Sequence, residues 1–146
     1  MFAYITGLVE EKYENSIVID VNGIGYLVQT TSSTLRRVKG LGDKVKLYTY
    51  LYVREDALTL YGFYTKEERS MFERLISVTG VGPKGALGIL STLSAADLAL
   101  AIVTNHVNLL TKAPGVGKKT AHRLILELKE KIETDELLDA SAGKTF

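Results

Sequence analysis

Up to Phe63, apolar and polar residues alternate in short runs, and turn-forming residues separate the runs. The runs are rich in β-branched and aromatic side chains, and a period of two is typical of β-strands with one buried face. This pattern predicts five strands, at residues 4–10, 16–21, 25–30, 44–53 and 57–63, with one helical turn at residues 32–38. So few strands favour a small closed barrel over a β-sandwich.

From Thr65 onward the apolar period becomes helical. The change begins at Thr65-Lys66-Glu67-Glu68, which has the S/T-x-x-E pattern of a helix capping box. Further helices are predicted at residues 83–90, 95–104, 106–111 and 118–132. The fold class is therefore α+β and multidomain: an oligonucleotide-binding (OB) type barrel at residues 1–64 is followed by an all-α domain at residues 65–133.

The helical part contains an internal repeat, because TGVGPKGA at residues 79–86 aligns without gaps with PGVGKKTA at residues 114–121. Each copy lies between two apolar-periodic segments. The glycines permit a tight turn and let the backbone approach a bulky ligand. Each turn ends at a helix N-terminus, where free amides and the helix dipole attract an anion, and a lysine follows. This chemistry fits a phosphate group.

Two familiar phosphate-binding motifs, the dinucleotide-binding fingerprint and the P-loop, match the repeat only in part. The spacing of Gly80, Gly82 and Gly85 matches the dinucleotide-binding fingerprint, but the segment before it has a helical period instead of the required strand. Gly117-Lys118 is similar to part of a P-loop, yet that motif would need Gly at Lys112 and a hydroxyl residue at Lys119. Neither a dinucleotide nor ATP is expected, and no cofactor is predicted.

Composition narrows the function classes. The chain has 0 cysteines and 2 histidines, His106 and His122, so no metal site is predicted. No apolar run approaches the roughly 20 residues of a membrane helix, and no secretory signal is recognisable, so a cytoplasmic protein without membrane contact is expected. The formal net charge is +1, but basic residues outnumber acidic ones between Thr65 and Glu133 and gather near the glycine turns. That placement suits nucleic acid.

The repeat resembles a pair of helix-hairpin-helix motifs, and its combination with a five-stranded barrel resembles the RuvA family of bacterial Holliday-junction-binding subunits. The resemblance covers nearly the whole chain. Besides both Gly-Val-Gly turns, it rests on MFAYITG at residues 1–7, DVNGIGY at residues 20–26, VREDA at residues 53–57 and LYGF at residues 60–63.

The resemblance implies a non-enzymatic protein that binds four-way DNA junctions through phosphates, as a homotetramer or an octamer, in recombination and repair. The residues expected to bind the DNA backbone are Thr79, Gly80, Gly82, Lys84, Gly115, Gly117, Lys118, Lys119, Thr120 and Arg123. Glu55 and Asp56 match the family's acidic pin, whose negative charges are expected to repel phosphates at the crossover. The tyrosines at positions 48, 50, 52, 61 and 64 suit base stacking or barrel packing, and packing is favoured.

Members of this family also carry a flexible linker and a third helical domain that docks on the RuvB motor ATPase. Residues 134–146 are expected to be the start of that linker, which leaves the motor-docking domain outside this chain. Two other functions stay open from the residues alone. One is a DNA glycosylase or nuclease, although no catalytic carboxylate cluster is recognisable; the other is a general single-strand or architectural DNA-binding protein.

Overall fold

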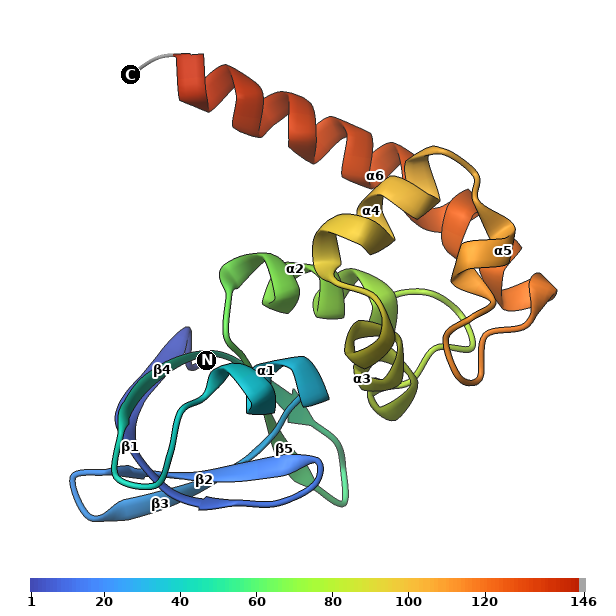
Figure 1. Ribbon diagram of the computed structural model, residues 1–146. Coiled ribbons are helices and arrows are strands. Elements are labelled where there is room, and N and C mark those ends of the chain that lie inside the picture. The colour runs from blue at the N-terminus through green and yellow to red at the C-terminus, as the bar shows by residue number, and fades with distance from the viewer. Residues whose placement is uncertain (145–146) are drawn as a thin grey trace. The chain divides into compact units, whose positions relative to one another are not determined.

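The computed structural model describes the backbone of residues 1–144 and the side chains of residues 1–135. The chain divides into two compact units, Met1–Glu73 and Arg74–Phe146. Figure 1 shows the strands in the N-terminal part and helices in the rest. In chain order the elements are β1 (Tyr4–Lys12), β2 (Ser16–Val21), β3 (Ile24–Gln29), α1 (Ser32–Arg37), β4 (Lys44–Val53), β5 (Leu58–Phe63), α2 (Lys66–Ile76), α3 (Pro83–Thr92), α4 (Ala95–Val103), α5 (Val107–Leu110) and α6 (Lys118–Lys144).

The strands form a closed barrel in the order β1–β2–β3–β5–β4, and β4 pairs with β1 to complete it. All neighbouring pairs are antiparallel except β3 with β5. Gly7 and Gly62 allow the strands to approach each other: a Cβ atom at Gly62 would lie 2.5 Å from Cγ1 of Val28, and one at Gly7 would collide with the carbonyl oxygen of Asp20. The predicted five-stranded barrel is confirmed.

Helix α1 packs on the barrel core, because Leu35 and Val38 belong to the same cluster of buried side chains as the inward-facing strand residues (Figure 1). Thr31 caps its N-terminus by accepting a hydrogen bond from the amide of Thr34 at 3.1 Å. Lys12 of β1 holds the other end, where its Nζ donates to the carbonyl oxygens of Leu35 and Val38 at 2.9 and 3.1 Å. The sequence pattern predicted this short helix but not its anchoring by Lys12.

Helix α2 packs on the barrel through Phe72, whose ring lies 4.9 Å from those of Tyr61 and Phe63 and 5.8 Å from that of Tyr50. The compact units consequently divide after Glu73. The predicted boundary near residue 64 marks the change from strand to helix, whereas the packing of α2 extends the barrel unit beyond it.

The second unit is built from α3 to α6, and its fully buried apolar side chains include Leu90, Leu98, Ile102, Leu110, Leu124 and Leu128. Ser94 caps α4, as its pattern predicted, by accepting a hydrogen bond from the amide of Asp97 at 3.1 Å. The predicted end of the last helix at residue 132 was wrong, since α6 continues to Lys144. Residues 134–142 contain Leu, Ala and Glu and no Gly or Pro, so helix propensity permits the extension even without an apolar period. The last two residues of the predicted linker start, 145 and 146, lie outside the described part of the chain.

Among residues 1–144, no single helix has the length and apolar composition to cross a membrane; only α3 and α4 taken together do, and they are bent by 95° at their break. The described residues also contain no group of three or more His, Asp or Glu side chains that could hold a metal ion.

Candidate nucleic-acid interface

The first glycine turn connects α2 to α3 with a local geometry that its sequence explains. Gly80 has φ of +90°, which L side chains rarely adopt. Val81 is only 8% exposed, and its amide donates to the carbonyl oxygen of Val78 at 3.0 Å. Gly82 then caps α3 without a side-chain hydrogen bond, and Pro83 begins the helix. The valine therefore anchors the turn while both glycines stay exposed.

The second turn, between α5 and α6, repeats this geometry. Gly115 has φ of +79°, and Val116 is 6% exposed with its amide donating to Ala113 at 3.1 Å. At the start of the following helix, the amide of Ala121 donates to the carbonyl oxygen of Gly117 at 2.9 Å, as the amide of Ala86 does to Gly82 in the first copy. The sequence repeat is therefore a repeat of backbone structure.

The two exposed glycines at the helix starts are not required by the fold. A Cβ atom at Gly82 or Gly117 would meet no other atom within 4 Å, and Gly82 has φ of −91°, which any residue can adopt. Gly80 and Gly115, by contrast, are needed for their positive φ angles. Open space in front of Gly82 and Gly117 gives a ligand direct access to the backbone of both turns.

Both turns offer the chemistry of an anion site. The amides of the first helical turn have no partner within their helix, and neither α3 nor α6 has an acidic residue there. The two turns differ in the number of donors and charges that they offer to an anion. Pro83 has no N–H, whereas the equivalent Lys118 supplies an amide and a positive charge and is followed by Lys119. The second turn therefore offers an anion more hydrogen-bond donors and more positive charge than the first.

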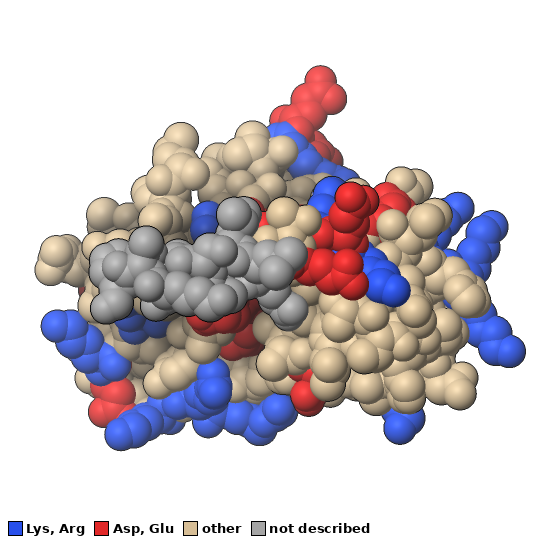
Figure 2. All heavy atoms as spheres, turned by 90° about the horizontal axis from the view of Figure 1, so that it is seen from above, with Lys and Arg blue, Asp and Glu red and all other residues tan. Residues whose placement is uncertain are grey.

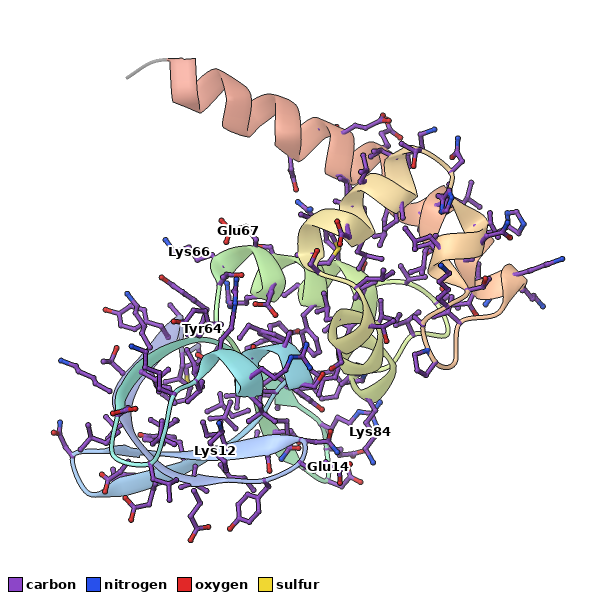
Figure 3. The ribbon with its side chains drawn as sticks, viewed as in Figure 1. Lys12, Glu14, Tyr64, Lys66, Glu67 and Lys84 are labelled. Carbon is purple, nitrogen blue, oxygen red and sulfur yellow. The ribbon has the colours of Figure 1, made fainter. Side chains whose placement is uncertain are left out.

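The predicted basic residues lie at these turns. Lys84, labelled in Figure 3, extends from the first turn of α3, and Lys118 and Lys119 are exposed on α6. None of these lysines forms an ion pair within the described residues. On the face shown in Figure 2, Lys and Arg side chains project at several places. The three lysines therefore place positive charge at the turns themselves.

Arg123 links the two copies. It belongs to α6, yet its Nη1 lies 3.5 Å from the position that a Cβ atom at Gly80 would take in the first turn. Thr79 is exposed beside the same glycine, and Thr120 is half-buried in the first turn of α6. The structure thus brings residues of both predicted turns near one another within the second unit.

Glu55 and Asp56 occupy the exposed turn between β4 and β5. The final register pair of the two strands is Val53 with Leu58, and the turn is closed by the amide of Arg54 donating to Ala57 at 2.9 Å. Neither carboxylate has a hydrogen-bond or ion-pair partner in the part of the chain that the structure describes. Two unneutralised negative charges therefore extend from the tip of the hairpin.

The tyrosines of β4 and β5 make contacts within the barrel unit. Tyr61 is 7% exposed, and Tyr50 and Tyr61 both pack on the ring of Phe72. Tyr64, directly after β5, lies under the guanidinium of Arg37, with 5.1 Å between its ring centroid and Cζ. The contacts of Tyr50 and Tyr61 support the packing role that the alternation favoured over base stacking.

The sequence pattern did not reveal that Glu68 is buried. Its carboxylate is reached by the hydroxyls of Ser33 and Thr65 at 3.4 Å and by the guanidinium of Arg37 at 3.9 Å. Burial raises the pKa of Glu68 above its ordinary value of 4.5, against the lowering effects of Arg37 and the hydroxyl groups. The capping-box pattern was the only sequence signal at this position, and it does not predict burial.

Replacing Glu68 with glutamine is expected to flatten the dependence of stability on pH. Because the folded-state pKa of Glu68 is raised, folding favours the protonated carboxyl group. The contribution of this group to the free energy of unfolding is therefore fully present below the unfolded-state pKa. It is lost as the pH rises through the folded-state pKa. Glu68→Gln cannot ionise, so its stability relative to the parent should increase as the pH rises from the unfolded-state pKa through the raised folded-state pKa. Chemical denaturation across this range measures it, with Glu67→Gln, an exposed neighbour, as the control. Equal pH profiles for the two variants would contradict the assignment.

A closed barrel followed by two equivalent glycine turns at helix N-termini places the chain in the class of helix-hairpin-helix proteins. Comparison with known proteins agrees: the profile described as RuvA N terminal domain matches residues 1–62, and the SAM-like helix-hairpin-helix tandem matches residues 72–130. The Holliday junction branch migration complex subunit RuvA of Acetivibrio thermocellus is 51% identical over 139 residues, which cover 95% of this chain and 69% of that protein. The subunit of the same name from Ruminiclostridium cellulolyticum is 52% identical over 137 residues, covering 94% and 69%. The chain belongs to the RuvA family.

Proposed function

We propose that this chain binds four-way DNA junctions by their shape, with both glycine turns on phosphates and the acidic hairpin tip at the crossover. Family membership makes it the non-catalytic, Holliday-junction-binding subunit of a branch-migration complex, with junction DNA and RuvB as the partners of that complex. The observation that best supports the residue-level proposal is the open space at Gly82 and Gly117, which the fold itself does not need.

Phosphate contacts fix the position of a protein on DNA without reading the base sequence. The proposed contacts come from backbone amides and from Thr79, Lys84, Lys118, Lys119, Thr120 and Arg123 at the two turns. Selectivity then has to come from the geometry of the DNA. A junction presents converging backbones that a single duplex lacks, and the unneutralised Glu55 and Asp56 disfavour a strand passing over the hairpin tip.

Self-association is part of the proposal, as a homotetramer or an octamer around one junction. Apolar side chains on the outside of the barrel support it, because Leu8, Ile24 and Leu27 are 48%, 59% and 53% exposed. Leu8 lies on β1 and the other two on β3, with β2 between these strands, and contiguous exposed apolar surface is typical of protein contact sites. The proposal also includes a cytoplasmic location and a role in recombination and repair.

The salt dependence of junction binding tests the phosphate contacts. Alanine at Lys84, Lys118, Lys119 or Arg123 is expected to reduce the slope of log K against log salt by about 0.9 for each phosphate that the variant no longer binds. The reduction should be the same on junctions of unrelated sequence, since no base is read. Junction affinity should fall more for Lys118→Ala or Lys119→Ala than for Lys84→Ala, because the second turn offers an anion more donors and more positive charge than the first.

Lys131→Ala is the matched control, since it removes the same charge from the same helix about three turns beyond Lys119. It should leave the slope unchanged. A slope that falls equally for Lys131→Ala, or an effect that depends on base sequence, would contradict the proposed phosphate binding.

A further inference from the structure

The hairpin tip carries a third charged residue, Arg54, directly before Glu55 and Asp56. Within the described residues Arg54 forms no ion pair with either carboxylate or with any other acid. Its Nε instead donates to the hydroxyl of Tyr52 at 3.1 Å, and its Cζ lies 5.2 Å from the centroid of the Tyr52 ring. Tyr52 therefore holds the cation back along the strand, and the acidic pair is left unneutralised.

Tyr52 is itself held by a series of aromatic contacts that ends in the core of the barrel unit. Its ring lies 6.2 Å from that of Tyr61 in an edge-on arrangement of 82°, and Tyr61 packs on Phe72 at 4.9 Å. Phe72 is fully buried. The positive charge of Arg54 opposes the rise that burial and Tyr52 cause in the pKa of Tyr61, which agrees with its place in this series. The guanidinium is thus oriented from the core outward.

The remaining donors of Arg54 have no partner among the described residues, so they can reach a ligand. A guanidinium has five N–H groups, of which Tyr52 uses the one on Nε, so both Nη groups stay available. Two adjacent N–H groups in a fixed plane match two oxygens of a phosphate, and an Arg that is already oriented loses less side-chain entropy on binding.

The two faces of the β4–β5 hairpin carry different kinds of side chain. Val53 and Leu58 form a cross-strand pair and are 65% and 71% exposed, whereas the adjacent pair, Tyr52 with Thr59, projects to the opposite face. The hairpin therefore has an apolar face, a face with Tyr52 and Arg54, and an acidic end. A phosphodiester strand would find a complementary charge on the Tyr52 face alone.

We propose that Arg54 is a DNA-binding residue of the hairpin, which holds a backbone phosphate of one junction strand on the Tyr52 face while Glu55 and Asp56 repel strands from the tip. The hairpin then guides a strand to one side as well as excluding it from the centre. Tyr52 is the positioning residue for this interaction. This inference rests on the proposed function, because it requires that the hairpin lie at a junction crossover.

Fluorescence-anisotropy titrations of a synthetic four-way junction and of a matched duplex, at several salt concentrations, test the proposal. Arg54→Ala should weaken junction binding about tenfold, as expected for removal of a hydrogen-bonded charge, and should lower the salt slope by about 0.9. Duplex binding should change much less than junction binding, because a duplex has no crossover at which Arg54 could hold a strand. Arg54→Lys should keep the slope and recover only part of the affinity, since lysine is a point charge without the planar fork.

Tyr52→Phe separates positioning from charge. It removes the hydroxyl that orients Nε but keeps the ring on Tyr61. Junction affinity should fall several-fold with an unchanged salt slope, and thermal unfolding should stay at the parent temperature. Arg36→Ala removes an exposed arginine of α1 that forms no ion pair with any described residue; it is the control and should alter neither affinity nor slope.

Two different results would overturn the inference. If the parent binds the junction and Arg54→Ala matches Arg36→Ala in affinity and slope, Arg54 does not bind DNA and the proposed function stands without it. If the parent does not prefer the junction over the duplex, the proposed function fails, and the inference fails with it.

Discussion

Leucine in place of Gly82 or Gly117 is expected to weaken junction binding by about a hundredfold and to leave the fold intact. Each side chain would project into the space in front of a helix N-terminus and keep a phosphate from the amides there. Loss of one or two hydrogen bonds to a charged group costs about 2–3 kcal/mol, which corresponds to about a hundredfold in affinity. The fold should tolerate the change, because a Cβ atom at either position meets nothing within 4 Å.

Titration of a labelled junction measures this loss, and thermal unfolding checks the fold. Alanine at Gly82, Gly117 and Gly88 gives a matched series. Gly88 lies within α3 and also has no atom within 4 Å of a Cβ position, so Gly88→Ala should keep full affinity and raise stability by about 1 kcal/mol through helix propensity. Undiminished binding by both leucine variants would show that these turns do not contact the DNA.

Reversing the charges of the hairpin tip, with Glu55→Lys and Asp56→Lys together, is expected to reduce the preference for a junction over a duplex by about tenfold. Both residues are exposed and unpaired in the described structure, so folding should not change. Junction affinity should hold or rise, because lysines would attract the phosphates that the carboxylates repel. Duplex affinity should rise more than junction affinity, because the reversed tip no longer repels a strand that passes over it.

The control for this reversal is the double variant Glu10→Lys and Glu14→Lys, which makes the same change in net charge at exposed positions of β1 and the following turn. It raises general attraction to DNA without altering the tip. If both double variants shift junction and duplex affinities alike, the acidic pair acts only through net charge. The pin assignment of Glu55 and Asp56 would then be wrong.

The features that were predictable from the sequence are those with a local cause. Alternation along five short runs predicted the barrel strands, and the gapless repeat around Gly80 and Gly115 predicted two equivalent turns, which the positive φ angles reproduce. Capping patterns predicted the starts of α2 and α4. Local propensity and turn chemistry decide these elements, so one sequence is enough to find them.

The features that were not predictable depend on contacts between distant segments. Phe72 follows the helical period of α2, and nothing local shows that its ring packs on Tyr50, Tyr61 and Phe63 of the barrel. Burial of Glu68 and the orientation of Arg54 by Tyr52 likewise depend on tertiary packing. The extension of α6 to Lys144 has a different reason: the absence of an apolar period predicts that a helix is unpacked but does not predict where it ends.

A competition experiment tests the central claim most directly. A labelled four-way junction is bound by the chain at fixed salt and is competed with unlabelled junction, duplex and single strand of the same base composition, in two unrelated sequences. Junction shape recognised through phosphates predicts that unlabelled junction competes at least about tenfold better than duplex or single strand, and equally well in both sequences. Equal competition by duplex or single strand, or a strong preference for one sequence, would contradict it.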